Sequence, residues 1–106
     1  MILRHATTRQ NLESIQRDGL LVSKADAGAR IKAVWLHAPS MSAWSVVHTI
    51  RKHGASLEDV VVLEVNVPRK GLQRFRRGLW FSRQDVPASA IVNVIDGTAF
   101  GASASE

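Results

Sequence analysis

The sequence predicts a single α+β domain, because two strand–helix pairs occupy its first half and three strands follow in its second half. Of the 106 residues, 45% are hydrophobic and 22% are charged. That length suits one domain with a modest core, and that hydrophobic content excludes a disordered chain. We expect the domain to span residues 1–96 and the small, polar residues 97–106 to form a flexible tail.

The first strand–helix pair lies at the N-terminus. Residues 2–6 alternate enough for a short strand. The helix that follows would be capped by Thr8 and would bury Leu12 and Ile15. Gly19 would end this helix in the left-handed conformation, which glycine adopts without steric cost.

The second pair predicts a strand at residues 33–37 and a helix that ends at Gly54. Ser40 or Ser42 would cap this helix. Three apolar residues share one of its faces and would point to the core: Trp44, Val47 and Ile50.

Three strands are expected in the second half of the chain. Residues 60–67 (VVVLEVNV) begin as an apolar run and end with alternation, which indicates a central strand. Residues 79–82 and 91–95 form shorter strands. Because the helices come early and the strands late, the order favours α+β over a doubly wound parallel sheet.

The charge of the chain is the first indication of function. Fourteen Lys and Arg residues against nine Asp and Glu give a net charge of +5. Such an excess attracts phosphate groups, either of a nucleic acid or of a nucleotide. A solvated basic loop is an equally weighted interpretation. The excess is concentrated in residues 69–83, the basic stretch, which has no acidic residue and six basic ones: Arg69, Lys70, Arg74, Arg76, Arg77 and Arg83.

Several kinds of chemistry are excluded by what the sequence lacks. Without cysteine there are no disulfides, cysteine nucleophiles or thiolate metal sites. No glycine-rich phosphate loop, Gly-x-Ser-x-Gly elbow or His-Glu-x-x-His helix occurs. The four histidines lack metal-ligand spacing, so no metal site is expected. No apolar run is long enough for a membrane span, and the N-terminus lacks the layout of a signal peptide, so we expect a cytoplasmic protein.

The junction between the first strand and the first helix carries candidate ligand-binding residues. His5, Thr7 and Thr8 lie there, beside the backbone N–H groups at the helix start. Their side chains would donate or accept hydrogen bonds to a ribose or an amide. The competing interpretation, favoured by the pattern alone, is that His5 belongs to the core and Thr8 is only a cap.

Other residues become ligand-binding candidates only in combination with those at this junction. Arg30 and Lys32 precede the strand at residues 33–37 and would pair with a pyrophosphate. Trp35 and Trp80 each lie inside a short strand, where a tryptophan stacks on a base or, more often, packs in the core.

Together these segments resemble the ADP-ribosyltransferase-like fold, most closely the NAD-binding lobe of the RNA 2′-phosphotransferases. Similar openings occur in toxin ADP-ribosyltransferases that modify DNA. The resemblance spans roughly residues 2–95. It is carried, in order, by four stretches: LRHATTRQNLESIQRDGL, RIKAVWLHA, VVVLEVNV and RRGLWFSRQDVPASAIVNV.

The resemblance implies a split, strongly bent pair of antiparallel sheets around an NAD cleft. It implies catalytic roles for His5 and for Arg30, which would sit near the pyrophosphate or the transferred phosphate. Thr7, Thr8 and Trp35 would bind NAD together with His5. The basic stretch would face a nucleic acid or the adenylate end of the ligand, with phosphate contacts expected from five residues: Arg69, Lys70, Arg74, Arg76 and Arg77.

The chain also departs from this family. The phosphotransferases have a separate N-terminal lobe with catalytic residues, for which these 106 residues have no room. Many ADP-ribosyltransferases use a late glutamate, and the carboxylates in the later strand region here are Glu64 and Asp85. The two histidines of a His-Val-His-Leu pattern become Ala33 and Trp35.

Three functions therefore compete. The first is an NAD-dependent transferase that moves ADP-ribose to a nucleic acid, a protein or a phosphate group. The second is a non-catalytic module that binds a nucleotide or a nucleic acid. The third is a small interaction protein whose cleft is vestigial.

Overall fold

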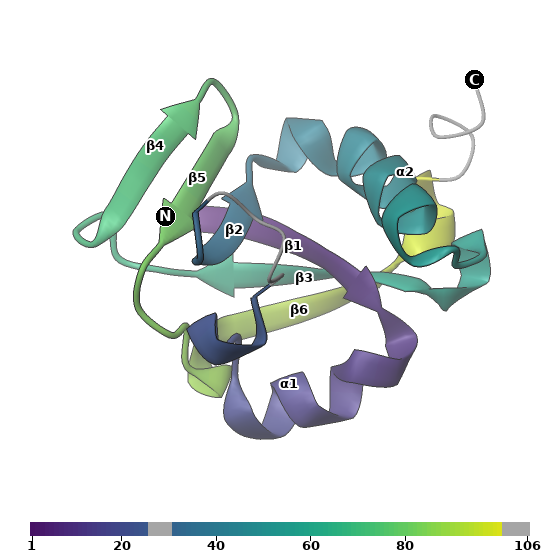
Figure 1. Ribbon diagram of the computed structural model, residues 1–106, viewed down its shortest axis with the longest axis horizontal. Helices are drawn as coiled ribbons and strands as arrows, with labels where there is room; N and C mark the ends of the chain where they lie inside the picture. The colour runs from purple at the N-terminus through teal and green to yellow at the C-terminus, as the bar shows by residue number, and fades with distance from the viewer. Residues whose placement is uncertain (26–30, 101–106) are drawn as a thin grey trace.

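The computed structural model describes residues 1–25 and 31–100, and within them six strands form one open antiparallel sheet (Figure 1). The strand order is β4-β5-β2-β1-β3-β6. The strand bounds are β1 (Ile2–Thr8), β2 (Val34–His37), β3 (Val60–Asn66), β4 (Leu72–Arg76), β5 (Leu79–Ser82) and β6 (Ile91–Asp96). This arrangement confirms the α+β class.

The sheet is narrowly joined in the middle. β1 pairs with β3 along its whole length, from Ile2 opposite Asn66 to Thr8 opposite Val60. Between the described strands β1 and β2, in contrast, the only register pair is Arg4 opposite His37. The half formed by β4, β5 and β2 therefore separates from the half formed by β1, β3 and β6 beyond that pair. In Figure 1 the two halves run in different directions.

The helices α1 (Leu12–Asp18) and α2 (Ser42–His53) cover opposite faces of the sheet (Figure 1). Neighbouring side chains on a strand point to opposite faces, and β3 shows this division. Leu63 packs in the cluster that includes Ile15 of α1, whereas Val62 packs with Val46 of α2. Within the described ranges, no helix is long and apolar enough to cross a membrane.

Both helices end at the glycines that the sequence indicates. Gly54 has φ 62° and ψ 28°, the left-handed conformation, and its N–H donates to the carbonyl of Ile50. Gly19 also has a positive φ, 84°, but its ψ of −171° is extended rather than left-handed. The extended ψ directs Leu20 to Val86, with which it exchanges two backbone hydrogen bonds of 2.8 and 2.9 Å.

One strand was not expected from the sequence. β4 lies inside the basic stretch, which is therefore a hairpin with β5 rather than a loop. Its sequence, Leu-Gln-Arg-Phe-Arg, lacks an apolar face because β4 is an edge strand with four of its five residues exposed. β4 forms a strand because it pairs with β5, and its sequence carries no hydrophobic periodicity that would indicate one.

Three helix details in the sequence analysis were wrong. Neither Ser40 nor Ser42 caps α2, because the helix begins at Ser42 after Met41 and no side chain makes the capping hydrogen bond. Thr8 does not cap a helix: it is the last residue of β1, and its side chain makes no capping hydrogen bond. Trp44 does not face the core, since it is 43% exposed. The buried residues of α2 are instead Ser42, Ser45, Val46 and Thr49.

The C-terminal boundary also differs from the expected one. Residues Gly97–Phe100 form a short 3-10 helix, Gly97 is buried, and Phe100 packs against the core cluster around Val46. The domain therefore continues past residue 96. Residues 101–106 of the predicted tail lie outside the described residues.

Candidate functional site

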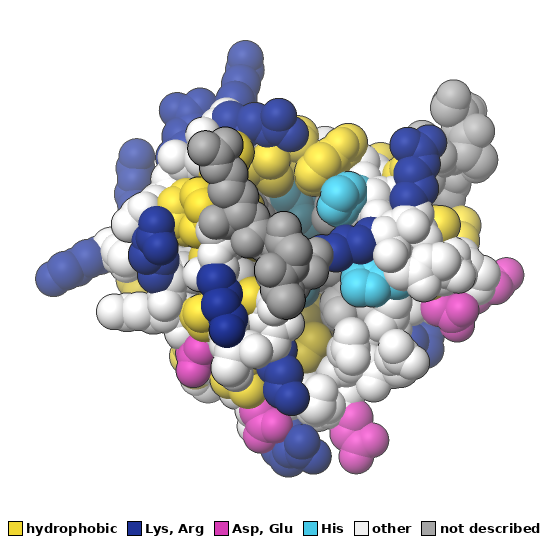
Figure 2. Space-filling model, viewed as in Figure 1, with side chains coloured by type: hydrophobic (Ala, Val, Ile, Leu, Met, Phe, Trp, Pro, Cys, Tyr) yellow, Lys and Arg dark blue, Asp and Glu magenta, His cyan; other side chains and the backbone are white. Residues whose placement is uncertain are grey.

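A cleft of about 1050 Å³ lies where β1 and β2 separate. The strands contribute His5 to Thr7 and residues 33–37 to its lining. Residues of α1 and α2 complete it from the two sides of the sheet. In Figure 2 histidine side chains reach the surface to the right of the middle of the face, over and beside α2. The four histidines, which are far apart in the sequence, all line this cleft: His5, His37, His48 and His53.

His5 bridges the separation between the two strands. Its Nδ1 lies 2.7 Å from the backbone carbonyl oxygen of Trp35. A carbonyl only accepts, so Nδ1 carries the proton and donates it. The neutral ring then keeps Nε2 as an acceptor. Burial lowers the pKa of His5 against the opposing effect of the Trp35 hydrogen bond, and the positive charge of Lys52 lowers it further. This environment favours the neutral ring.

Thr7 and Asn11 form a polar group beside His5. Both residues line the cleft. The Asn11 amide nitrogen donates to the hydroxyl oxygens of Thr7 and Thr8 over 3.4 and 3.1 Å. Thr8 is not among the residues that line the cleft, so its hydroxyl supports Asn11 from behind. The side-chain amide oxygen of Asn11 (Oδ1) and the Thr7 hydroxyl are the groups of this cluster suited to a ligand.

The α2 side of the cleft is formed by an aromatic pair and a cation. Trp44 and His48 stack with ring centroids 5.3 Å apart and an interplanar angle of 12°. Lys52 follows one turn later, and all three residues line the cleft. Their i, i+4, i+8 spacing places them on one helix face.

The charges that line the cleft favour an anion. Lys24 and Lys52 contribute two ammonium groups. Among the described lining residues the only carboxylate is Asp18, which is half-exposed and paired with Arg17 at 3.0 Å. Hydrogen bonding to Arg17 holds the pKa of Asp18 below its usual value. A phosphate-bearing ligand fits this balance better than a cation does.

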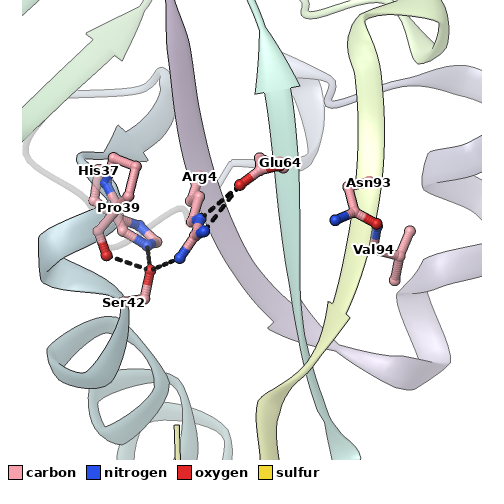
Figure 3. A network of polar contacts seen from close by, with 7 residues as sticks. All are labelled: Arg4, His37, Pro39, Ser42, Glu64, Asn93 and Val94. Atoms are coloured by element: carbon pink, nitrogen blue, oxygen red, sulfur yellow. Dashed lines mark hydrogen bonds and ion pairs between the residues drawn. The ribbon is translucent and has the colours of Figure 1, made fainter. Parts of the chain in front are cut away.

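A second polar network holds β1, β3 and α2 together (Figure 3). Arg4 donates from Nε and from a terminal nitrogen to one carboxylate oxygen of Glu64, at 3.0 and 2.9 Å. Its other terminal nitrogen donates to the Ser42 hydroxyl, at 3.0 Å, and that hydroxyl donates to the Pro39 carbonyl. Glu64 is thus engaged by Arg4 and does not line the cleft.

Asp85, the other late carboxylate, accepts a hydrogen bond from the Val22 backbone N–H at 2.8 Å. It too is absent from the cleft lining. Neither acid that the sequence offered therefore faces the candidate ligand site. In the part of the chain that is described, no group of three or more His, Asp or Glu residues is placed to hold a metal ion.

His37 makes a pH-dependent contribution to stability. Burial, followed by the charges of His5 and Arg4, lowers the pKa of His37 from 6.5 to about 4. Between these pH values the unfolded state binds more protons, so the free energy of unfolding falls as the pH drops below 6.5. We expect a loss of about 2–3 kcal/mol between pH 7.5 and 4.5 from this residue. Urea denaturation at both pH values measures it.

The comparison variant is His37→Gln, which removes the titrating group. Its stability should fall less than that of the wild type over the same pH interval, with the remainder including His5, whose pKa is also lowered. His53→Gln changes an exposed histidine and should behave as the wild type does. An equal fall in all three proteins would contradict the role of His37.

The structure brings together only part of the predicted site. His5, Thr7 and Trp35 line the cleft, whereas Arg30 lies outside the described residues. The Trp35 ring packs at tilted angles against Phe75 and Phe81, with centroids 5.2 Å away in each case. Its indole nitrogen donates to the Ile31 carbonyl. The defined contribution of Trp35 to the site is its backbone carbonyl, which holds His5.

The basic residues of the sequence prediction form a separate surface. Arg69, Lys70, Arg74, Arg76 and Arg77 are exposed on β4 and the turns beside it, and none of them lines the cleft. Beside them, Phe75 is 51% exposed, and the Arg83 guanidinium lies 5.5 Å from the Phe81 ring centroid. In Figure 2 several Lys and Arg side chains project over the β4–β5 side.

Sequence reasoning missed the α2 side of the cleft and Asn11. The signal was present as Trp44, His48 and Lys52 at i, i+4, i+8, a row of residues able to bind a ligand. The expectation that Trp44 shares the core face with Val47 and Ile50 follows from the usual burial of apolar residues, and it hides this row.

Comparison of the chain with protein-family models finds no match, and comparison with curated proteins finds no significant relative.

Proposed function

We propose that the protein binds NAD in the cleft and transfers its ADP-ribose to a nucleic acid, protein or phosphate acceptor. The observation that carries the proposal is His5, which is fixed across the split sheet by the Trp35 carbonyl and keeps Nε2 as an acceptor. The cleft volume of about 1050 Å³ lies just above the usual range for small-molecule sites, which suits a ligand as large as a dinucleotide. Its two lysines suit a pyrophosphate, and its polar side chains suit ribose hydroxyls.

In this proposal the chain acts mainly by position and charge. His5 Nε2 accepts a hydrogen bond from the nicotinamide ribose or amide, and Thr7 lies beside it. Nicotinamide leaves with the electron pair of its bond to the ribose carbon, the acceptor oxygen forms the new bond to that carbon, and the proton of an acceptor hydroxyl passes to solvent water. The positive charge that develops on the ribose is stabilised by preorganised acceptors, the usual means for such a step.

A second candidate function is binding without turnover. It is favoured by the two late carboxylates, since Glu64 is bound to Arg4 and Asp85 to the Val22 N–H. Neither is placed to activate an acceptor. A module of this kind would keep the nucleotide site and would lack the transfer step.

Titration calorimetry with NAD, followed by measurement of free nicotinamide in the same sample, separates these functions. Binding with nicotinamide release supports the transferase, and binding without release supports the non-catalytic module. Failure to bind NAD rejects both as NAD proteins and favours an interaction protein with a vestigial cleft. The proposal places the protein in the cytoplasm, where NAD and nucleic acids are both present.

We also propose that the basic stretch contacts single-stranded nucleic acid. The support is the combination of exposed cations with the exposed ring of Phe75, since proteins bind single strands by pairing cations with phosphates and stacking bases on aromatic rings. The surface belongs to the β4–β5 hairpin, and Leu79 of β5 also lines the cleft. A nucleic-acid strand bound to this hairpin would pass beside the ligand site.

Salt dependence tests this surface. For a single-stranded oligonucleotide, we expect log K to fall linearly with log salt, with a slope near −0.7 per phosphate contact. The double variant Arg74→Gln/Arg76→Gln should make that slope less negative by about 1.4 if both side chains contact phosphates. Fluorescence anisotropy at several salt concentrations measures it.

The matched control is Arg17→Gln/Arg51→Gln, which changes the net charge equally at exposed positions on α1 and α2. Its slope should equal that of the wild type. If the two double variants shift the slope equally, or if the wild type shows no salt dependence, the hairpin is not the nucleic-acid surface.

A further inference from the structure

α2 exposes its largest apolar side chain to the cleft. Trp44 is 43% exposed, although the same helix buries the hydroxyl side chains of Ser42, Ser45 and Thr49 against the sheet. Turning the helix to bury the indole would remove more apolar area from water. Packing within the domain therefore does not account for the position of Trp44, and the ring is available to a ligand.

The stacked neighbour of Trp44 supports this interpretation. His48 lies almost parallel to the indole, 5.3 Å away between centroids, and both residues line the cleft. Together they form an aromatic platform on the α2 side of the cleft. Flat heteroaromatic rings such as nucleobases bind by stacking on exposed aromatic side chains.

The same helix face also carries a cation. Lys52 lies two turns beyond Trp44, which corresponds to about 12 Å along the helix axis. Its charge reaches His5 on the opposite side of the cleft, where it contributes to the lowered pKa. The cleft thus combines an aromatic platform, an ammonium group one helical turn beyond it and a histidine on β1. These groups match what a dinucleotide presents, which is a base, phosphates and a second ring.

We propose that the Trp44–His48 platform stacks the adenine ring of the bound nucleotide. The proposal rests on the proposed function, which assigns the nicotinamide half of NAD to His5 and so leaves adenine for the platform. Trp44 and His48 are then adenine-binding residues, and Lys52, one turn beyond His48 on the same helix, is suited to the phosphates.

The test uses the two halves of NAD as separate probes. AMP contains the adenine ring and nicotinamide mononucleotide contains the other ring, and each carries one phosphate. By calorimetry, Trp44→Ala should weaken AMP binding about tenfold or more, the usual effect of losing one stacking partner of a base. It should change the affinity for nicotinamide mononucleotide less than about twofold. Trp44→Phe, which keeps an aromatic ring, should restore most of the AMP affinity.

Two further variants complete the design. His48→Ala should also weaken AMP binding, and it tests the platform without changing the indole. Val92→Ala truncates an apolar side chain that is 54% exposed on β6, outside the cleft, and should bind both probes as the wild type does. Circular dichroism of each variant shows whether the fold is kept.

The outcomes separate this proposal from the proposed function. Unchanged AMP affinity in both Trp44→Ala and His48→Ala overturns the platform, even if NAD is bound and cleaved. A loss confined to nicotinamide mononucleotide also overturns it, because the stacked ring is then nicotinamide. AMP affinity that depends on Trp44, in a protein that does not cleave NAD, supports the platform and rejects the transferase. A wild type that binds neither probe rejects both.

Discussion

Gly19→Ala is expected to lower the free energy of unfolding by about 4 kcal/mol or more, a loss that few single substitutions cause. Gly19 has φ 84° and ψ −171°, a backbone region that is essentially restricted to glycine and costs an L-residue about 1–3 kcal/mol. A Cβ at this position would also meet two atoms of the facing backbone, the Val86 carbonyl oxygen and the Ala88 nitrogen, the latter at 2.9 Å. Neither is a flexible side-chain atom that turns away.

The surroundings of Gly19 prevent an easy adjustment. Leu20 and Val86 exchange two backbone hydrogen bonds, so moving the chain away from the new methyl group would stretch both. Leu20 is also 5% exposed in the core cluster beneath α1. Because Asp18, Gly19 and Leu20 line the cleft, the same displacement would alter the α1 side of the ligand site. Urea denaturation followed by circular dichroism measures the stability.

Gly54→Ala is the matched control. Gly54 also ends a helix with a positive φ, 62°, but a Cβ there would find nothing within 4 Å. Only the conformational cost remains, about 1 kcal/mol. If the two substitutions destabilise the protein equally, the close approach of Val86 has no energetic consequence and the argument from contact is wrong.

The fold could be predicted from the sequence where local patterns and burial agree. The buried apolar run of β3 and the glycines that end α1 and α2 are signals of this kind. β4 could not be predicted in the same way, because an exposed edge strand needs no apolar face and its pairing depends on β5. The face of α2 was also misjudged, since small hydroxyl side chains are buried against the sheet where larger apolar ones were expected.

In the candidate site, too, residues marked by a local pattern could be predicted, and contacts that depend on tertiary structure could not. His5 and Thr7 could be singled out because the sequence pattern places them where the first strand leads toward a helix, although β1 continues to Thr8 and His5 lies in its middle. The hydrogen bond from His5 to the Trp35 carbonyl joins residues 30 positions apart. Only the split between β1 and β2 creates it, and no local pattern encodes that split. Asn11 reaches the cleft from the turn just before α1, and His48 and Lys52 reach it from α2, so their meeting depends on tertiary structure alone.

His5→Ala is expected to weaken NAD binding about tenfold to a hundredfold, the effect of losing one or two hydrogen bonds in a partly buried site. The substitution removes the Nε2 acceptor, and it also removes the ring that joins β1 to the Trp35 carbonyl. Nicotinamide release should fall at least as much as binding does. Calorimetry and the nicotinamide assay, run on the same samples, measure both effects.

The pH dependence of the wild type distinguishes the acceptor role from a purely structural one. Nε2 accepts a hydrogen bond only while the ring is neutral, and burial lowers the pKa of His5 below 6.5. NAD affinity should therefore stay constant from pH 8 to pH 6.5 and decline only at lower pH, as the ring takes up a proton. In His5→Ala this decline should be absent from the residual binding.

Ile2→Ala is the matched control on the same strand, because Ile2 is 43% exposed and does not line the cleft. Its NAD affinity should equal that of the wild type. If His5→Ala keeps the wild-type affinity while its unfolding free energy falls, His5 is a core residue that closes the split sheet. The cleft would then have to bind its ligand through Lys24, Lys52 and the α2 platform. That result would assign ligand binding to α2 rather than to β1, and the Trp44 variants test binding by α2 independently.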